Sequence, residues 1–404
     1  MKRFIPIRSK LLLLLSAIAL APALGTAALD IQLLRSLSGD LTSRNAEALA
    51  QQALDIMERA ASNYADTLAR DARRIELLVN LQAEEMQRLL SEGEAGPGPV
   101  YTALDFDRRP EVVGATPNKH YRTAQSAEDP ERPAPPLPVS WDHQVFFAPQ
   151  LPLAPETEHN ARILTAATSF YRKIRSQDES LIKWHYTVLD SGLTATYPGH
   201  GMYPDNFDAR TRGWYQLQRL APGFRYYRPH FDATTGALVI NATMPLFDGA
   251  ENFIGITGID VDLSATYSRL SLPENLREGS ELLQVAALRP PLVDSSRVVV
   301  LARQHGEASA TDWQQLPELE TLQIGDAKTT RELSNALLTG QEGALRVTTD
   351  KEDLFVVYRR FSEAGAYVLM TVPVARATAA ASAAAAPIYI EFVQTLIFPG
   401  PSAE

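Results

Sequence analysis

The sequence predicts an α+β protein in which a long N-terminal helix precedes two modules built on antiparallel sheets. Residues 30–93 are rich in Ala, Leu, Glu, Gln and Arg, contain no proline, and repeat apolar residues at helical spacing. Gly93, Gly96 and Pro97 end that pattern. Residues 146–375 instead carry short apolar runs divided by turn sequences, which is the pattern of strands and hairpins.

Composition excludes several classes of function. The 404 residues suffice for two domains with a sizeable core. A formal net charge of −10 argues against a nucleic-acid partner, which needs a basic surface. The chain has no cysteine, so thiolate chemistry and cysteine zinc sites are excluded.

The N-terminus has the pattern of a membrane segment. Four basic residues come first: Lys2, Arg3, Arg8 and Lys10. Residues 11–29 are uncharged, and as a helix they would span roughly 28 Å, close to the thickness of a bilayer core. We therefore expect residues 1–10 to form a cytoplasmic tip, residues 11–29 a transmembrane anchor, and the rest to lie outside the cytoplasm. The alternative is a signal peptide cleaved near residues 23–28.

The helix predicted over residues 30–93 has two interpretations. Its apolar stripe either packs along both modules or pairs with a second chain as a coiled coil. A structural spine without a dimer role is the simpler alternative. Residues 94–145 follow as a Pro-rich connector, with five prolines between Glu128 and Pro138.

The first module, residues 146–270, is expected to contain one helix and two hairpins. Helical spacing returns at residues 155–176, and strands are expected at residues 181–189, 193–197, 237–247 and 253–263. Alternation along the last strand places Ile256, Gly258 and Asp260 on one face. Gly258 leaves room beside Asp260, which helps that carboxylate to meet a ligand.

The residues from Phe207 to Tyr215, Phe-Asp-Ala-Arg-Thr-Arg-Gly-Trp-Tyr, are the most informative stretch. Arg212 suits a ligand carboxylate through its bidentate fork, whereas Trp214 and Tyr215 suit an aromatic wall that favours a cation. Arg212 and Trp214 converge only if Arg212 lies before a helix that starts at Gly213.

Two carboxylates follow at Asp232 and Asp260, and both suit an ammonium group. The set predicts a site for a small zwitterion or amine. Structural alternatives exist: Arg212 could pair with Asp208 or Asp205, and Asp232 could cap the turn before Gly236. Phe207 could belong to the ligand pocket or to the core, and His230 could donate to the ligand or be a surface histidine.

These residues resemble the ligand-binding core of double Cache (dCache) domains, the PAS-like extracytoplasmic sensors of bacterial chemoreceptors and sensor kinases. Amino-acid-binding members carry Tyr, four residues, Arg, one residue, Trp, Tyr; then Tyr, one residue, Asp; then an Asp closing a strand. Five residues match this pattern: Arg212, Trp214, Tyr215, Asp232 and Asp260. Phe207 and His230 stand where the family has tyrosines.

The resemblance implies that Arg212, Trp214 and the residue at position 207 face a ligand carboxylate. It implies that Asp232 and Asp260 face the ligand amino group. The amine half of the site therefore matches the family, and the carboxylate half is weakened by the loss of two tyrosine hydroxyls. This leaves amines as well as amino acids as candidate ligands.

The resemblance covers residues 30–375 and implies two PAS-like (Cache) modules. Residues 146–270 would be the membrane-distal module with the ligand pocket, and residues 271–375 the membrane-proximal module, usually without ligand. The implied function is a homodimeric sensor in the bacterial inner membrane, with most of its chain in the periplasm and dimerised through the long helix. A tethered solute-binding protein without signalling is one alternative. A truncated or frame-shifted receptor is another, because residues 376–404 are an Ala-rich tail without an output domain.

Enzyme function is not expected. The sequence has no P-loop, no GxSxG, no dinucleotide fingerprint and no zincin motif. Asp260 and Asp262 could form an acid–base pair, but strand alternation explains them equally well. A metal set of His185, His200, Asp205 and His230 lacks ligand spacing. We therefore expect neither a metal nor a cofactor.

Overall fold

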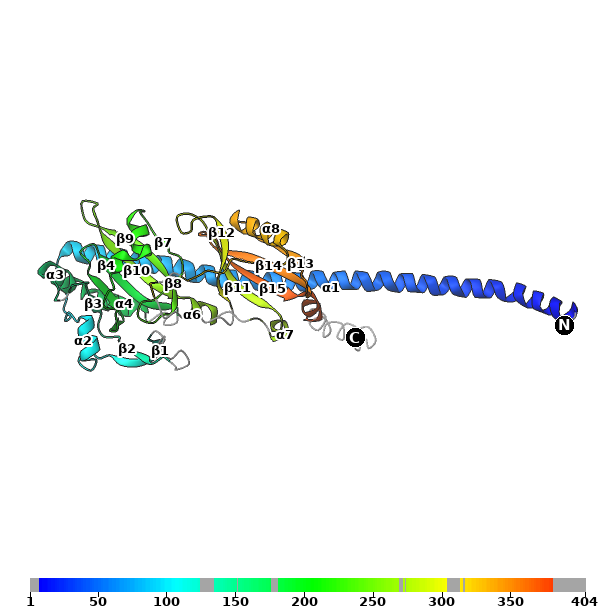
Figure 1. The fold of residues 1–404 in the computed structure, drawn as a ribbon, viewed down its shortest axis with the longest axis horizontal. Coiled ribbons are helices and arrows are strands. Elements are labelled where there is room, and N and C mark those ends of the chain that lie inside the picture. Colours follow the sequence, from blue (N-terminus) through cyan, green and yellow to red (C-terminus); the bar gives the residue numbers. More distant parts are fainter. Residues whose placement is uncertain are drawn as a thin grey trace, which may run out of the picture. The chain divides into compact units, whose positions relative to one another are not determined.

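The computed structural model describes residues 7–123, 134–150, 152–175, 181–268, 272, 274–303, 313–314 and 317–380. The chain divides into two compact units, and Glu58–Val372 form the unit that holds both modules. Helix α1 (Ile7–Glu92) supplies the long N-terminal helix (Figure 1). Among the described residues, no helix combines the length and apolarity needed to cross a membrane. The anchor at residues 11–29 therefore stays a prediction.

The module that contains the strands from β3 to β10, called the distal module after the position expected for it, is built on a seven-stranded antiparallel sheet in the order β3-β5-β4-β10-β9-β7, with β8 also paired to β9. Its strands are β3 (Val145–Phe147), β4 (Ile182–Leu189), β5 (Thr194–Tyr197), β7 (Arg225–Tyr226), β8 (His230–Phe231), β9 (Leu238–Phe247) and β10 (Phe253–Asp262). The hairpin strands agree with the ranges expected from the sequence within about one residue.

The pairing registers of the central strands determine which side chains lie next to one another at the site. On β10, Asp260 lies opposite Trp184 of β4 and Asn241 of β9. Two residues earlier, Gly258 lies opposite Tyr186 of β4. Alternation thus puts these side chains on one face of the sheet.

Short elements surround this sheet. They are α2 (Ala103–Arg108), α3 (Pro155–Leu164), α4 (Ala167–Arg175), the 3-10 turn η1 (Ala209–Thr211), α5 (Gly213–Arg219) and α6 (Leu263–Ser268). A three-stranded sheet is formed by β1 (Thr116–Arg122), β2 (Pro136–Ser140) and β6 (Gly199–His200). The sequence predicts only a connector where α2, β1 and β2 lie, because prolines obscure short strands.

The helix expected over residues 155–176 is divided between α3 and α4. Its carbonyl groups are engaged by other segments at the break. The Arg162 carbonyl accepts from the Gly96 N–H at 2.9 Å, and the Leu164 carbonyl accepts from the Gln144 side chain at 2.7 Å. A Cβ on Gly96 would lie 2.3 Å from the Ala166 nitrogen, so this close approach needs glycine.

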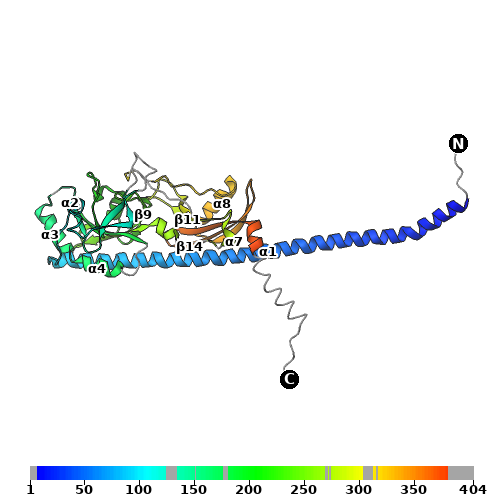
Figure 2. The same cartoon turned by 90° about the horizontal axis from the view of Figure 1, so that it is seen from below.

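The second half of α1 packs along both modules (Figure 2). Ile75, Leu78 and Val79 are buried against the distal sheet, at Ile182 and Ile259. Nearer the proximal module, the Glu58 carboxylate pairs with the Arg359 guanidinium at 3.4 Å. This part of α1 therefore serves as a common support for both sheets.

The proximal module has a five-stranded antiparallel sheet in the order β12-β11-β15-β14-β13. Its elements are α7 (Glu274–Arg277), β11 (Glu281–Leu288), β12 (Arg297–Arg303), α8 (Ala327–Leu338), β13 (Gly343–Thr348), β14 (Asp353–Ser362) and β15 (Ala366–Pro373). Leu333 and Leu337 of α8 pack on one sheet face. The α+β class with a long helix and two antiparallel modules is confirmed.

Candidate functional site

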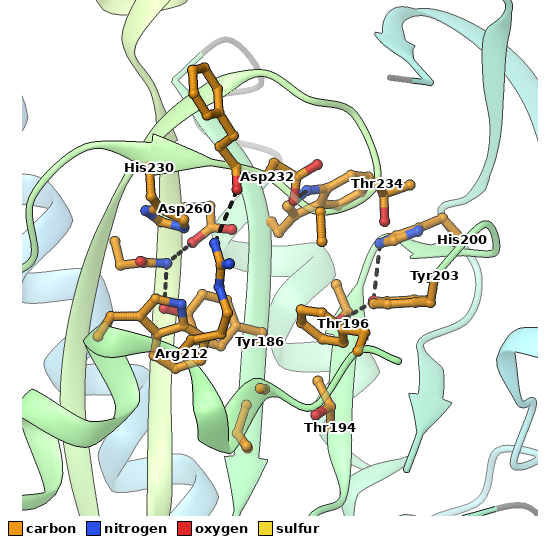
Figure 3. Close-up of a pocket in the computed structure, with 18 residues that line it drawn as sticks. Tyr186, Thr194, Thr196, His200, Tyr203, Arg212, His230, Asp232, Thr234 and Asp260 are labelled. Carbon is orange, nitrogen blue, oxygen red and sulfur yellow. Dashed lines mark hydrogen bonds between the residues drawn. The ribbon is translucent and has the colours of Figure 1, made fainter. Parts of the chain in front are cut away.

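A cavity of about 50 Å³ lies on the face of the distal sheet that carries Asp260 (Figure 3). Six of the seven residues selected from the sequence line it: Phe207, Arg212, Trp214, His230, Asp232 and Asp260. One water-sized group needs about 10–15 Å³, so the cavity has room for roughly three to five such groups. That volume suits a small ligand.

Asp260 is the most deeply buried acid of the site, with 7 % of its surface exposed. One carboxylate oxygen accepts from the Asn241 side-chain N–H. The same Asn241 nitrogen donates to the Tyr186 hydroxyl at 2.9 Å. Burial raises the pKa of Asp260 well above its usual value, and the neighbouring Asp232 raises it further. The carboxyl group therefore resists ionisation until a cation reaches it.

Asp232 combines a structural contact with a place in the cavity. It accepts from the Thr235 backbone N–H at 2.7 Å, so it does cap the turn, as the structural alternative held. Its second oxygen accepts from the Trp184 indole N–H at 3.2 Å. The turn thus fixes the carboxylate in the cavity wall.

Arg212 lies where the sequence argument required it, at the N-cap of α5 and outside the helix. Its guanidinium donates to the Phe231 carbonyl at 3.2 Å and to the Trp313 carbonyl at 3.0 Å. It also lies over the Trp313 ring, 4.9 Å from the ring centroid. Burial lowers the pKa of Arg212, an effect opposed by Asp232 and Asp260.

The ion pair considered for Arg212 is made by its neighbour. Arg210 binds the Asp208 carboxylate at 2.8 Å. Arg212 thus faces the cavity with two N–H groups held by backbone carbonyls, and a guanidinium has five N–H donors in all. Part of the fork remains to meet a ligand.

The side chains of Trp214 and Tyr215 point in different directions at the start of α5. Trp214 lines the cavity and packs on Tyr186, with ring centroids 5.1 Å apart. Tyr215 is fully buried, does not line the cavity, and donates its hydroxyl to Asp190 at 3.3 Å. Consecutive residues of a helix point about 100° apart, which explains why one faces the cavity and the other the core.

His230 is buried rather than exposed on the surface, with 4 % of its area accessible. Burial, aided by the nearby Arg212 charge, lowers its pKa to about 3. Its imidazole is therefore neutral at physiological pH. Phe207 lines the cavity but also packs among aromatic rings. Its ring centroid lies 5.6 Å from that of Tyr203 and 5.5 Å from that of Trp313.

Several residues that line the cavity were not expected from the sequence to bind a ligand. The main ones are Trp184, Tyr186, Tyr203 and Asn241, and His200 was considered only as part of a metal set. The strand pattern offered a signal for two of them, since Trp184 and Tyr186 alternate on β4 as Gly258 and Asp260 do on β10. The Tyr203 hydroxyl lies 2.9 Å from Thr196 Oγ1 and 3.1 Å from His200 Nε2. No local motif marks that loop.

Two alternative chemistries, an acid–base pair and a metal site, have few of the contacts that they would need. Asp262 does not line the cavity and pairs with Lys183 at 3.3 Å, so it is separated from Asp260 as an acid–base partner. Among the described residues, no group of three His, Asp or Glu side chains is arranged to hold a metal ion.

Neither a protein-family model nor a curated protein matches the chain. Solved structures do match. The extracellular domain of the histidine kinase mmHK1S-Z3 is 13 % identical, with 83 % of this chain and 98 % of that chain covered and a TM-score of 0.46. The ligand-binding domain of Mlp24 with asparagine is 13 % identical, with 84 % and 98 % covered and a TM-score of 0.41. The ligand-binding domain of the Pseudomonas fluorescens chemoreceptor CtaA with L-isoleucine is 14 % identical, with 82 % and 97 % covered and a TM-score of 0.43.

Proposed function

We propose that this protein is a membrane-anchored, extracytoplasmic sensor that binds a small amine or amino acid in the distal cavity. The observation that carries the proposal is the buried carboxyl group of Asp260 facing a cavity that also holds Asp232. Two acids against one guanidinium favour a ligand with a positive charge. A ligand ammonium would allow Asp260 to ionise.

The cavity is less well equipped to bind a ligand carboxylate than a ligand amine. Two N–H groups of Arg212 already donate to the carbonyls of Phe231 and Trp313. Trp214, whose indole N–H is a further donor, also lines the cavity. An amino acid can bind through these donors, but the amine is the required group.

A sensor needs a structural connection between the cavity and α1, and the hydrogen bonds of Gln82 support such a connection. This residue of α1 is fully buried behind the sheet. Its amide donates to the carbonyls of Tyr186 and Gly258, at 3.1 and 3.0 Å, and to the Thr257 hydroxyl at 2.7 Å. The strands that present Tyr186 and Asp260 to the ligand are thus bonded directly to α1. A protein that only sequesters a solute does not need this link.

Dimerisation through α1 is part of the proposal. Leu77 and Leu81 lie one helical turn apart and are 59 % and 42 % exposed. They lie on the side of α1 opposite the fully buried residues Val79 and Met86. An exposed leucine pair of this kind suits a partner helix from a second chain.

Ligand class can be tested with three small probes that differ in one group: L-alanine, ethylamine and propionate. We expect L-alanine and ethylamine to raise the thermal stability of the purified chain, and propionate to leave it unchanged. A ligand at about 100 times its dissociation constant adds roughly 2.7 kcal/mol to stability. Stabilisation by propionate but not by ethylamine would contradict the proposal. Asp205→Asn, which alters an exposed acid outside the cavity, provides the matched control.

A further inference from the structure

A second cavity, of about 140 Å³, lies where the two modules meet the long helix. Its walls come from three directions. They include Leu68 and Ile75 of α1, Ile240 and Val261 of the distal sheet, and Ala286 and Leu288 of β11. Most of its lining side chains are aliphatic or aromatic. The cavity is separate from the distal site, and it shares no lining residue with it.

Gln284 is a polar residue in this mostly apolar lining. It is 2 % exposed, lies on β11, and lines the cavity. Its side-chain nitrogen Nε2 has no hydrogen-bond partner among the described residues. A buried donor left without an acceptor costs stability, and a leucine of similar size would avoid that cost. The amide is accounted for if an acceptor enters the cavity.

Arg228 adds a second donor at the same wall. Its Nη2 donates to the Pro317 carbonyl at 3.3 Å, whereas its Nε is buried without a partner among the described residues. The lining contains one acid as well, Asp71. Because Asp71 and Arg228 carry opposite charges, the cavity has no net charge that would select an ion. Two donors without acceptors, in a mostly apolar space whose two charged residues offset each other, indicate the chemistry of an occupant.

We propose that this cavity is a second binding site, for a small neutral molecule with an apolar body and one acceptor oxygen directed at Gln284. The size agrees, since an engineered apolar cavity of about 150 Å³ binds benzene. This proposal is independent of the ligand of the distal cavity. Its walls also mean that an occupant contacts α1 and both modules at once.

Phenol and toluene form a suitable pair of probes, because they have nearly the same size and shape and differ by a hydroxyl group in place of a methyl group. Isothermal titration calorimetry on the purified chain should give tighter binding for phenol, by roughly three- to tenfold for one neutral hydrogen bond. In Gln284→Leu that preference should vanish while toluene still binds. Ala286→Leu fills the cavity and should weaken both probes at least tenfold.

Three controls make the test decisive. Cooperative thermal unfolding shows whether Ala286→Leu folds, and Leu292→Phe fills the same cavity from a loop if it does not. Asp205→Asn, an exposed acid that lines neither cavity, should leave the binding of both probes unchanged. The proposal is overturned if neither probe binds the parent chain. It is also overturned if Gln284→Leu keeps the phenol preference, or if both filled variants bind normally.

Discussion

Replacing Asp260 by asparagine should weaken amine binding and, at the same time, stabilise the empty protein. Asparagine keeps the size of the side chain and an oxygen that can accept from Asn241, as Asp260 does now. What it removes is the ability to carry a negative charge. In the parent chain, burial and the nearby Asp232 raise the pKa of Asp260, so ionisation in the empty cavity is unfavourable.

The two expected effects have different magnitudes and opposite signs. Loss of one partner in a desolvated charge pair costs about 2–5 kcal/mol, which corresponds to a roughly 30- to 4,000-fold higher Kd for ethylamine. Stability changes the other way. The folded parent retains the Asp260 proton above the unfolded-state pKa of about 4, so its stability falls as pH rises from there towards the raised pKa. Asp260→Asn removes that fall.

Calorimetric titration with ethylamine measures the first effect, and urea unfolding between pH 4 and pH 8 measures the second. Asp205→Asn, an exposed acid outside the cavity, should change neither quantity appreciably. Unchanged ethylamine binding in Asp260→Asn would show that the carboxylate does not meet the amine. A variant less stable than the parent across this pH range would show that Asp260 serves the fold as an ion.

Four further predictions follow from the same contacts. Ethylamine binding should release protons below the raised pKa of Asp260 and tighten as pH increases, as calorimetry in buffers of different ionisation enthalpy can measure; no proton release would contradict the assignment. Gln82→Leu should lower the free energy of unfolding in urea by about 1–3 kcal/mol, because buried polar groups lose their partners; an unchanged value would show that the link is weak. Leu77→Glu with Leu81→Glu should convert a dimer to a monomer in light scattering, and a parent that is already monomeric would refute the helix interface. Phe207→Tyr should raise the affinity for L-alanine relative to ethylamine about tenfold, since a hydroxyl donor to a charged group is worth about 1.5–3 kcal/mol; an unchanged ratio would place position 207 away from the ligand carboxylate.

Local patterns predicted the parts of the site that depend on neighbouring residues. The position of Arg212 before α5 followed from helix geometry and the glycine after it, and the structure places it at the N-cap. Alternation on β10 correctly put Asp260 on the cavity face. The role expected for Gly258 was incomplete. A Cβ there would lie 2.7 Å from the Tyr186 hydroxyl, so the glycine makes room for that tyrosine beside Asp260.

Non-local contacts set the rest of the site, and no short motif encodes them. Asn241 reaches Asp260 only because β9 and β10 pair in one register, and a shift of one residue would turn it away. Trp313 lies 101 residues after Arg212, yet its carbonyl and its ring both contact that guanidinium. The connector was underestimated for a related reason: β1 and β2 are stabilised by pairing with each other and with β6 rather than by a local apolar pattern.

The two faces of β4 and β10 explain how a ligand charge in the cavity could change the contacts of α1. On one face, Tyr186 and Asp260 line the cavity. On the other, the Gln82 amide bonds to the carbonyls of Tyr186 and Gly258, so one peptide unit separates ligand contacts from helix contacts. A ligand shifts a conformational equilibrium only through its different affinity for the two states. Moving a population from 1:99 to 99:1 takes about 5.5 kcal/mol. The roughly 2–5 kcal/mol assigned to the Asp260–ammonium contact would supply much of that free energy, provided that the contact forms in one of the two states alone.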